Sequence, residues 1–402
     1  MYPPRRASRL FATTAAPAGS WGGTPPPRPP DPPGTTASVA RMVRWRSATV
    51  TAVRREWKGA VELDVTLVDG AAVRALAYPE LVGRPQAGDR VLLNVNALLM
   101  GLGTGGYALV VALPDRLPPD PPTPAESRAA GHLVKARYTP LQPILLGVDE
   151  EASPHRAALA DADDLSGLPV VTADLHSALP AVLAGIRADT PNARVAYLLT
   201  DGGALPAWFS RTLAGLREHL VGTISVGQAF GGDLEAGTLH AGLLAARHVL
   251  HADLAVVAQG PGNLGTGTRW GFSGVAVGEA VNAIAALGGR PVGSLRISAA
   301  DARPRHRGVS HHSLTAYGRV ALASAELVVP DQLDPALATT VEVALAPLAA
   351  RHRVRRVPVD GLDAALRASP VPLSTMGRGL DADYAYFLAA AAAGRHAARL
   401  AG

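Results

Sequence analysis

From residue 144 to the C-terminus, short apolar runs alternate with segments of helical periodicity, and this alternation limits the fold more than any other feature of the sequence. Uninterrupted apolar runs are typical of strands buried on both faces of a parallel sheet. Strands are predicted at Ile144–Val148, Val170–Ala173, Val195–Leu199, Gly222–Val226, Leu254–Val257, Val292–Ile297, Leu327–Val329 and Val354–Val359. Helices are predicted at about residues 177–188, 206–220, 236–251, 273–287, 311–325, 335–351, 361–368 and from 381 onward. The alternation predicts a doubly wound, mainly parallel α/β domain over residues 132–402, with right-handed crossovers.

Residues 43–113 have a different period, in which apolar and polar side chains alternate one by one. Asp69-Gly70 stands between two such runs and is a strong hairpin signal. Five or six antiparallel strands closing into a small barrel are predicted, with a role in packing or dimerisation. Residues 91–113 carry no charge, so a membrane helix is the alternative for them. Turn glycines and polar side chains within that span favour two strands.

Two proline-rich segments flank the predicted barrel. Residues 1–41 contain ten prolines and no periodic apolar pattern, which predicts a disordered extension. A signal peptide fits poorly, because no apolar stretch follows the first arginines. Whether translation starts at Met1 or at Met42 stays open. Residues 114–131 are predicted to be a proline-rich linker.

The basic charge of the chain is concentrated at its start. The net charge is +5, but residues 1–41 contain five arginines and one aspartate, which leaves 33 basic and 32 acidic side chains in the remainder. A nucleic-acid-binding protein should carry its basic excess on the folded part, so nucleic acid is not an expected partner. The chain contains no cysteine, which excludes disulfides, thiolate zinc sites and cysteine nucleophiles.

A glycine-rich loop separates the predicted strand at 254–257 from the helix at 273–287. A loop of this kind, followed by a helix, presents backbone N–H groups to an anion. We therefore predict that the loop binds a phosphate or carboxylate group. The predicted contacts are Gly260, Gly262, Asn263, Gly265, Thr266, Gly267 and Thr268. The alternative is a surface turn whose glycines adopt positive φ.

The loop does not carry a complete standard motif. Its glycines fit the dinucleotide-binding spacing, but it follows the fifth strand of its domain, and no acidic residue lies about twenty positions beyond the last of these glycines. No lysine follows Gly267, as a phosphate-binding P-loop requires. Residues 271–275 lack the second glycine of a nucleophile elbow. The cofactor is therefore unknown, and a divalent metal is left open.

Polar side chains follow five consecutive predicted strands, at the point where each strand ends. In an open parallel sheet these ends meet at one edge, where ligands bind. The catalytic candidates at this edge are Asp174, Asp201, His311 and His312. His176 and His311 are the candidate metal ligands.

The pair His311-His312 follows Ser310, which is a typical N-cap residue. Both histidines should lie in the first turn of a helix, where the dipole favours neutral imidazole, the form that binds metals and accepts protons. Adjacent helix positions point about 100° apart, so one ring is expected to act as ligand or base and the other to pack or cap. Unrelated surface histidines are the alternative.

Arg303 and Arg307 precede the histidine pair and are predicted to bind an anionic group. The alternative for these arginines is a solvated basic turn.

Several long strings of the sequence resemble one known family. They are RWRSATVTAVRREW, LAYPELVG, LLMGLGTGGYALV, HLVKARYTPLQ, PVVTADLHSALP, GPGNLGTGTRWGFSGV and RHRGVSHHSLTAYGRV. From about Met42 to the C-terminus the chain is similar to the bacterial domain of unknown function 3866 family. The resemblance implies a soluble bacterial protein and no particular activity.

These patterns together predict an enzyme that acts on a small phosphorylated or carboxylated substrate, with a histidine or aspartate as base. The alternative is a non-catalytic binding or regulatory protein that uses the same cleft. A cytoplasmic location and a small anionic ligand are expected, with no membrane partner. The sequence does not indicate the oligomeric state.

Overall fold

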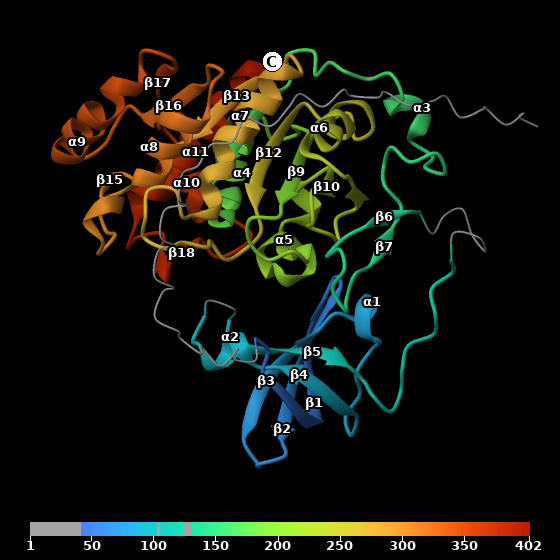
Figure 1. Ribbon diagram of the computed structural model, residues 1–402. Coiled ribbons are helices and arrows are strands. Elements are labelled where there is room, and N and C mark those ends of the chain that lie inside the picture. Colours follow the sequence, from blue (N-terminus) through green and yellow to red (C-terminus); the bar gives the residue numbers. More distant parts are fainter. Residues whose placement is uncertain (1–41, 103–104, 124–130) are drawn as a thin grey trace, which may run out of the picture. The chain divides into compact units, whose positions relative to one another are not determined.

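The computed structural model describes residues 42–102, 105–123 and 131–402 (Figure 1). The predicted extension over residues 1–41 and residues 124–130 of the predicted linker lie outside the described residues. A closed barrel is followed by an α/β domain, so the predicted fold class is confirmed. Within the part of the chain that the structure describes, no helix has the length and hydropathy needed to cross a membrane.

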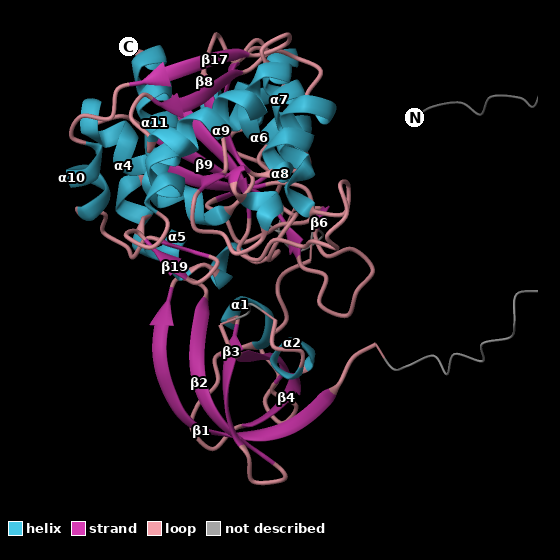
Figure 2. Cartoon of the chain, turned by 90° about the vertical axis from the view of Figure 1, so that its left-hand side faces the viewer, coloured by secondary structure: helices cyan, strands magenta, loops and turns pink. Residues whose placement is uncertain are grey.

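The barrel consists of five strands in the closed order β1-β2-β3-β5-β4 (Figure 2). The strands are β1 (Trp45–Trp57), β2 (Ala60–Leu67), β3 (Ala72–Ala77), β4 (Arg90–Asn94) and β5 (Tyr107–Ala112), and two short helices are α1 (Pro79–Val82) and α2 (Asn96–Leu99). All neighbouring strands are antiparallel except β3 and β5, which are parallel. A closed ring of five strands cannot alternate direction completely, so one parallel pair is unavoidable. The described residues of the uncharged span 91–113 form most of β4, all of α2 and all of β5, and none of them belongs to a membrane-spanning helix.

The barrel core is made by the predicted alternation. Val61, Leu63 and Val65 of β2 point inward and are buried, and the hairpin between β2 and β3 turns at Gly70 with φ of 85°. Because L-residues rarely adopt this backbone conformation, glycine fixes the turn.

The α/β domain is organised around an eight-stranded sheet in which every neighbouring pair is parallel. In spatial order the strands are β11 (Leu234–Glu235), β10 (Gly222–Ser225), β9 (Val195–Thr200), β12 (Leu254–Gln259), β8 (Pro169–Ala173), β13 (Arg290–Ser294), β16 (Glu326–Pro330) and β17 (Arg353–Val357). The chain runs outward from β8 to β11, returns at β12 and continues on the other side through β13. The ends of β12, β8 and β13 therefore surround the point at which the strand order reverses, which is where such sheets bind ligands.

Helices cover both faces of this sheet (Figure 1). One face carries α4 (Leu179–Asp189), α10 (Leu362–Arg367) and α11 (Tyr384–Ala401). The other carries α6 (Leu239–His248), α7 (Ala276–Ala286) and α9 (Pro335–Leu345), together with the short helix α3 (Arg156–Leu159), which packs on α6. Val170 and Val171 of β8 belong to opposite cores, which explains why the strand reads as an uninterrupted apolar run.

Several predicted elements differ from the structure in length. The helix expected over 311–325 is α8 (His311–Thr315) followed by a π-helical turn (Ala316–Val320). It ends early because Asn282 of α7 accepts hydrogen bonds from the backbone N–H groups of Leu322 and Ala323. The helix expected over 206–220 is reduced to α5 (Arg211–Gly215) between two 3-10 turns.

Three two-stranded ribbons were not predicted as such. They are β6 (Leu133–Val134) with β7 (Ile144–Leu145), β14 (Ile297–Ser298) with β15 (Gly308–Val309), and β18 (Ser374–Thr375) with β19 (Arg378–Gly379). The predicted strand Ile144–Val148 places Ile144 and Leu145 in a ribbon and meets the edge of the main sheet through a parallel bridge between Gly147 and Glu235 of β11. The predicted strand Val292–Ile297 is divided between β13 and β14. Strands of two residues are too short to show a period.

Candidate functional site

The three central strands of the sheet are each followed or ended by a buried polar side chain. Asp174 follows β8, Gln259 ends β12 and Arg296 follows β13, and their exposed fractions are 6%, 4% and 2%. Burying such groups is unfavourable unless they are paired. We therefore treat this edge of the sheet as the candidate site.

Three histidines gather next to these side chains. His306 ends a 3-10 turn, and His311 and His312 open helix α8. Each histidine offers a ring nitrogen, and the three nitrogens lie within 4.8 Å of one another. The ring centroids of His311 and His312 are 4.4 Å apart.

The closeness of His311 and His312 differs from the expectation that adjacent helix positions would separate the two rings. Helical side chains lean toward the N-terminus, and no preceding helical turn stands in the way at this position. Both rings also lie 4.9 Å, between centroids, from the ring of His306, which precedes the helix, so the three rings come together at the start of α8.

Ser310 fixes the orientation of this cluster. Its hydroxyl accepts a hydrogen bond from the backbone N–H of His312 at 3.2 Å, as predicted for an N-cap. The same hydroxyl lies 2.7 Å from Nδ1 of His306. His306 therefore presents its other nitrogen, Nε2, to the cluster.

Two histidines of the cluster, His306 and His311, favour the neutral form. Burial, with the charges of Arg296 and Arg303 as further causes, lowers the pKa of His306 to about 3. Burial and the neighbouring His312 lower the pKa of His311 to about 4. A neutral imidazole keeps a lone pair on one ring nitrogen, and that lone pair can bind a metal or accept a proton.

Asp174 faces this cluster from the end of β8. Its Oδ2 lies 3.7 Å from Nδ1 of His312, which is too far for a direct hydrogen bond. Gly274 packs closely against Asp174. A Cβ at position 274 would lie 3.0 Å from the Cβ of Asp174, so glycine leaves the room that the Asp174 side chain occupies. The structure thus brings Asp174 and His312 close together, as the sequence predicts, while their catalytic role stays a prediction.

Unpaired polar atoms concentrate at this edge. Among the residues that the structure describes, nine buried side-chain nitrogen or oxygen atoms have no hydrogen-bond partner. Five of the nine belong to the site: Asp174 Oδ2, Gln259 Oε1, Arg296 Nη1, His311 Nε2 and His312 Nδ1. Each such atom costs about 1–3 kcal/mol of stability. Their concentration singles out this edge of the sheet among the described residues.

Arg296 is a cation held in a fixed position. Its Nη2 donates to Asp301 at 3.1 Å, and its backbone N–H donates to Ser313. Arg303 also donates to Asp301, and this contact holds the pKa of the Asp301 carboxyl well below its usual range. Because Asp301 stays ionised and buried, Arg296 is neutralised on one side and has its Nη1 free on the other.

A second acid supports the arginine network from a distant part of the chain. Arg378 of β19 lies between Asp301, at 3.3 Å, and Asp383, at 2.9 Å. Asp383 also accepts from the Ser298 hydroxyl at 2.8 Å. These buried pairs hold the segment that follows β13 in place.

The glycine-rich loop lies over the histidines. It folds back on itself, with Gly265 bridged to Phe272 and the N–H of Thr266 donating to the Gly271 carbonyl at 2.7 Å. The ring of Phe272 stacks on His312 with centroids 3.8 Å apart. The loop and the segment 301–313 therefore lie at the same edge of the sheet, as the strand-end argument predicts.

The polar groups of this loop largely bond to one another. Asn263 Oδ1 accepts from Ser273 and Gln259, and the hydroxyls of Thr266 and Thr268 lie 3.1 Å apart. Gly262 and Gly267 have φ of 90° and 84°, as the surface-turn alternative requires. Gly260 is buried, whereas Gly265 through Thr268 are exposed. An anion-binding role for the loop stays a prediction, and its observed contact is with His312.

Four other predicted site residues stand outside the cluster. His176 is buried, with Nδ1 at 2.9 Å from the Tyr197 hydroxyl and Nε2 at 2.6 Å from the Ser210 hydroxyl, so both ring nitrogens are already engaged. Asp201 is exposed and accepts from the backbone N–H of Gln228. Arg303 is paired with Asp301, and Arg307 is exposed and donates to the Asp301 carbonyl.

Sequence reasoning assigned no role to three residues that complete the site. The sequence could have indicated His306, because it lies only five residues before His311, in the loop that leads into the same helix. Arg296 was placed inside a predicted strand. Arg378 has no signal, because only the folded chain brings β19 to this edge.

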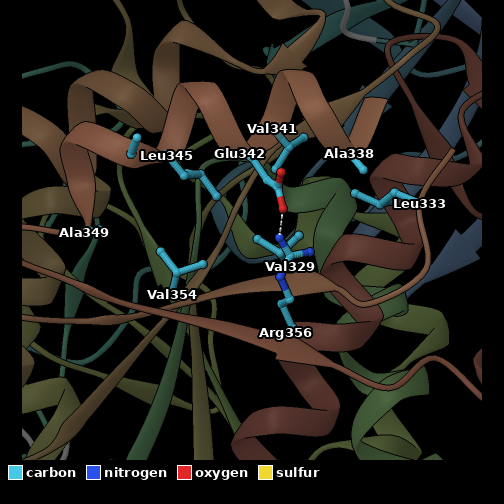
Figure 3. Close-up of a pocket in the computed structure, with 10 residues that line it drawn as sticks. Val329, Leu333, Ala338, Val341, Glu342, Leu345, Ala349, Val354 and Arg356 are labelled. Carbon is cyan, nitrogen blue, oxygen red and sulfur yellow. Dashed lines mark hydrogen bonds and ion pairs between the residues drawn. The ribbon is translucent and has the colours of Figure 1, made fainter. Parts of the chain in front are cut away.

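A separate hollow lies between α9 and the strands β16 and β17 (Figure 3). Its lining is apolar apart from Glu342 and Arg356, which form an ion pair across it. It contains none of the residues described above. An apolar hollow whose charges are paired offers no group for acid–base chemistry, so the candidate site remains the edge with the histidines.

Comparison with known proteins gives one informative match. A family model described as a protein of unknown function (DUF3866) matches residues 74–394, which is most of the chain. No curated protein and no solved structure matches.

Proposed function

We propose that this chain, which belongs to the DUF3866 family of proteins of unknown function, is an enzyme that acts on a small substrate carrying a phosphate or carboxylate group. The observation that carries the proposal is the set of five buried, unpaired polar atoms at the ends of β12, β8 and β13 and at the start of α8. The set combines proton acceptors with a cation. Active sites combine such groups in a buried cleft.

Arg296 is the proposed contact for the anionic group of the substrate. Its free Nη1 can donate a charge-assisted hydrogen bond, and its pairing with Asp301 prevents it from turning away. The pairing also positions the guanidinium before the substrate arrives, which lowers the entropic penalty of binding.

Asp174 is the proposed proton acceptor, with His312 beside it. An unpaired carboxylate oxygen in a buried site is a competent general base once a substrate proton comes within hydrogen-bond reach. Phe272 covers the ring of His312 and helps to keep bulk water away.

A cytoplasmic location in a bacterium is part of the proposal and is supported by the family resemblance. A non-catalytic binding protein that uses the same edge is the second candidate. The observation in its favour is that the glycine-rich loop matches no standard catalytic motif completely.

The proposal is tested by screening sugar phosphates, nucleotides and small dicarboxylates for thermal stabilisation of the full chain. Compounds that stabilise it are then followed by NMR for turnover. Arg296→Met should weaken binding by tenfold or more, because a hydrogen bond to a charged group contributes about 1.5–3 kcal/mol. Arg305→Met removes an exposed arginine from the same segment and is the matched control.

Three outcomes decide between the candidates. Turnover that is lost in Asp174→Asn supports the enzyme. Binding that depends on Arg296 without any turnover supports the non-catalytic alternative. Binding that is equal in wild type and Arg296→Met contradicts the proposed site.

A further inference from the structure

We propose that His306, His311 and His312 bind one divalent transition-metal ion of the zinc class. The metal site rests on the geometry of these side chains alone. Its use in catalysis rests on the function proposed above.

The separations of the three nitrogens suit a shared ion after a small closure. They all lie within 4.8 Å of one another. In a tetrahedral site with Zn–N bonds of about 2.0–2.1 Å, two ligand nitrogens lie roughly 3.4 Å apart, so ring rotations must shorten the longest separation by up to about 1.4 Å. The three residues come from one short segment whose backbone is held by the Ser310 cap.

The nitrogens that face the proposed ion have no other role. His311 Nε2 and His312 Nδ1 are buried without a hydrogen-bond partner. His306 has Nδ1 at 2.7 Å from the Ser310 hydroxyl, which leaves Nε2 for the ion. Metal-binding histidines are commonly oriented in this way through their second nitrogen.

Two core histidines of the same chain show what a purely structural histidine looks like. His352 has its Nδ1 at 3.1 Å from the Ala325 N–H and its Nε2 at 2.8 Å from the Tyr317 carbonyl. His176 has a partner at each nitrogen as well. In these cases burial is compensated by hydrogen bonds. His311 Nε2 and His312 Nδ1 lack this compensation, and a bound cation supplies it.

The donor set selects the class of metal. Three imidazoles suit zinc and its transition-metal neighbours, whereas magnesium and calcium prefer oxygen ligands. The charged groups near the cluster include three arginines and three acids. Arg296, Arg303 and Arg378 are paired with Asp301 and Asp383, and the third acid, Asp174, has its Oδ2 unpaired 3.7 Å from His312.

Three protein ligands leave one coordination position for water, as in catalytic zinc sites. A zinc ion lowers the pKa of its bound water to about 7. Together with the proposed function, this makes hydrolysis the reaction. Water gives one proton to Asp174, the hydroxide oxygen bonds to the phosphorus or carbonyl carbon, the bond to the leaving group breaks, and the leaving group takes the proton from Asp174.

The test measures metal binding by the full chain after treatment with a chelator. We expect one Zn²⁺ per chain by elemental analysis, and Co²⁺ should give the visible absorption of a four-coordinate ion. His306→Ala, His311→Ala and His312→Ala should each weaken Zn²⁺ binding by more than about a hundredfold, since losing even an outer-shell partner costs 10- to 100-fold. His176→Gln is the matched control, because it removes a buried histidine outside the cluster.

A second variant guards against misfolding as the explanation of a loss. The chain contains no cysteine, so His311→Cys introduces a unique thiol. If position 311 is a ligand, the Co²⁺ form of this variant gains a thiolate-to-cobalt absorption band. A bound Co²⁺ without that band contradicts the assignment.

Other outcomes separate the two proposals. A folded wild-type chain that binds neither Zn²⁺ nor Co²⁺ at micromolar concentration overturns the metal site, as does loss of binding in His176→Gln alone. Metal binding without any turnover supports the metal site and contradicts the enzyme. Turnover by the metal-free chain supports the enzyme and contradicts the metal's catalytic use.

Discussion

A single hydroxyl group, that of Ser310, links the start of helix α8 to the orientation of His306. Ser310→Ala removes both contacts. We expect the free energy of unfolding to fall by about 1–2 kcal/mol, because an N-cap is lost and a buried ring nitrogen loses its partner.

The same substitution should weaken Zn²⁺ binding by about 10- to 100-fold, since the orienting partner of a ligand is removed. Urea denaturation and a Zn²⁺ titration measure the two effects separately. A loss of stability with unchanged Zn²⁺ affinity would show that Ser310 acts only as a cap.

His176 provides a pH-dependent contribution to stability. Burial lowers its pKa to about 4 in the folded chain, against about 6.5 when unfolded. Because the folded pKa is the lower one, the unfolded state binds more protons between these values, and stability falls as the pH falls through this window. This residue alone should reduce the free energy of unfolding by about 2 kcal/mol between pH 7 and pH 5.

His176→Gln cannot take up this proton. The variant should be less stable than wild type at pH 7 but should lose about 2 kcal/mol less on going to pH 5. Urea denaturation of both chains at the two pH values measures this difference. Equal losses in the two chains would mean that His176 is not held neutral by burial.

At the scale of elements, helices α4 and α11 approach closely because both carry glycine at the contact. A Cβ at Gly185 would lie 1.8 Å from the Ala391 carbonyl oxygen, and one at Gly394 would lie 2.0 Å from that of Val182. Alanine in place of glycine normally stabilises a helix by about 1 kcal/mol.

Helix propensity alone predicts that Gly394→Ala increases the stability of the chain. Because of the close contact, we expect this substitution to decrease it. The backbones must separate to admit the methyl group, and overpacking of this kind costs about 1–3 kcal/mol. Thermal denaturation gives the sign of the effect. An increase in melting temperature would contradict the close approach of the two helices.

The main sheet could be predicted because its strands are buried on both faces and read as apolar runs. The two-residue ribbons could not, since they are held by tertiary contacts. The early end of the α8 segment depends on Asn282, which lies about 40 residues earlier in the chain. The residue at which this segment ends could therefore not be predicted from local helix propensity.

The candidate site could likewise be predicted only in part. Asp174, His311 and His312 follow from the rule that parallel strand ends meet at one edge. The close contact of the His311 and His312 rings does not follow from this rule. It depends on their position in the first turn of α8, where no preceding helical turn separates them. Arg378 depends on a hairpin about 80 residues away in the chain.

At the scale of the whole chain, the domain boundaries remain predictions from the sequence. We expect trypsin to cut first within residues 1–41 and next after Arg128 in the proline-rich segment, because chains without a core are cleaved most readily. Mass spectrometry of the early fragments locates the cuts. Early cleavage inside residues 43–113 or 132–402 would contradict the boundaries.

The most direct test of the account is a crystal of the chain grown with Zn²⁺ and measured at the zinc absorption edge. The account predicts one anomalous peak with bonds of about 2.0–2.1 Å to ring nitrogens of His306, His311 and His312. Asp174 should lie beside the open coordination position, and Arg296 should face it. Ordered density for the three histidines with no peak among them, or a peak at His176 instead, would contradict the central claim.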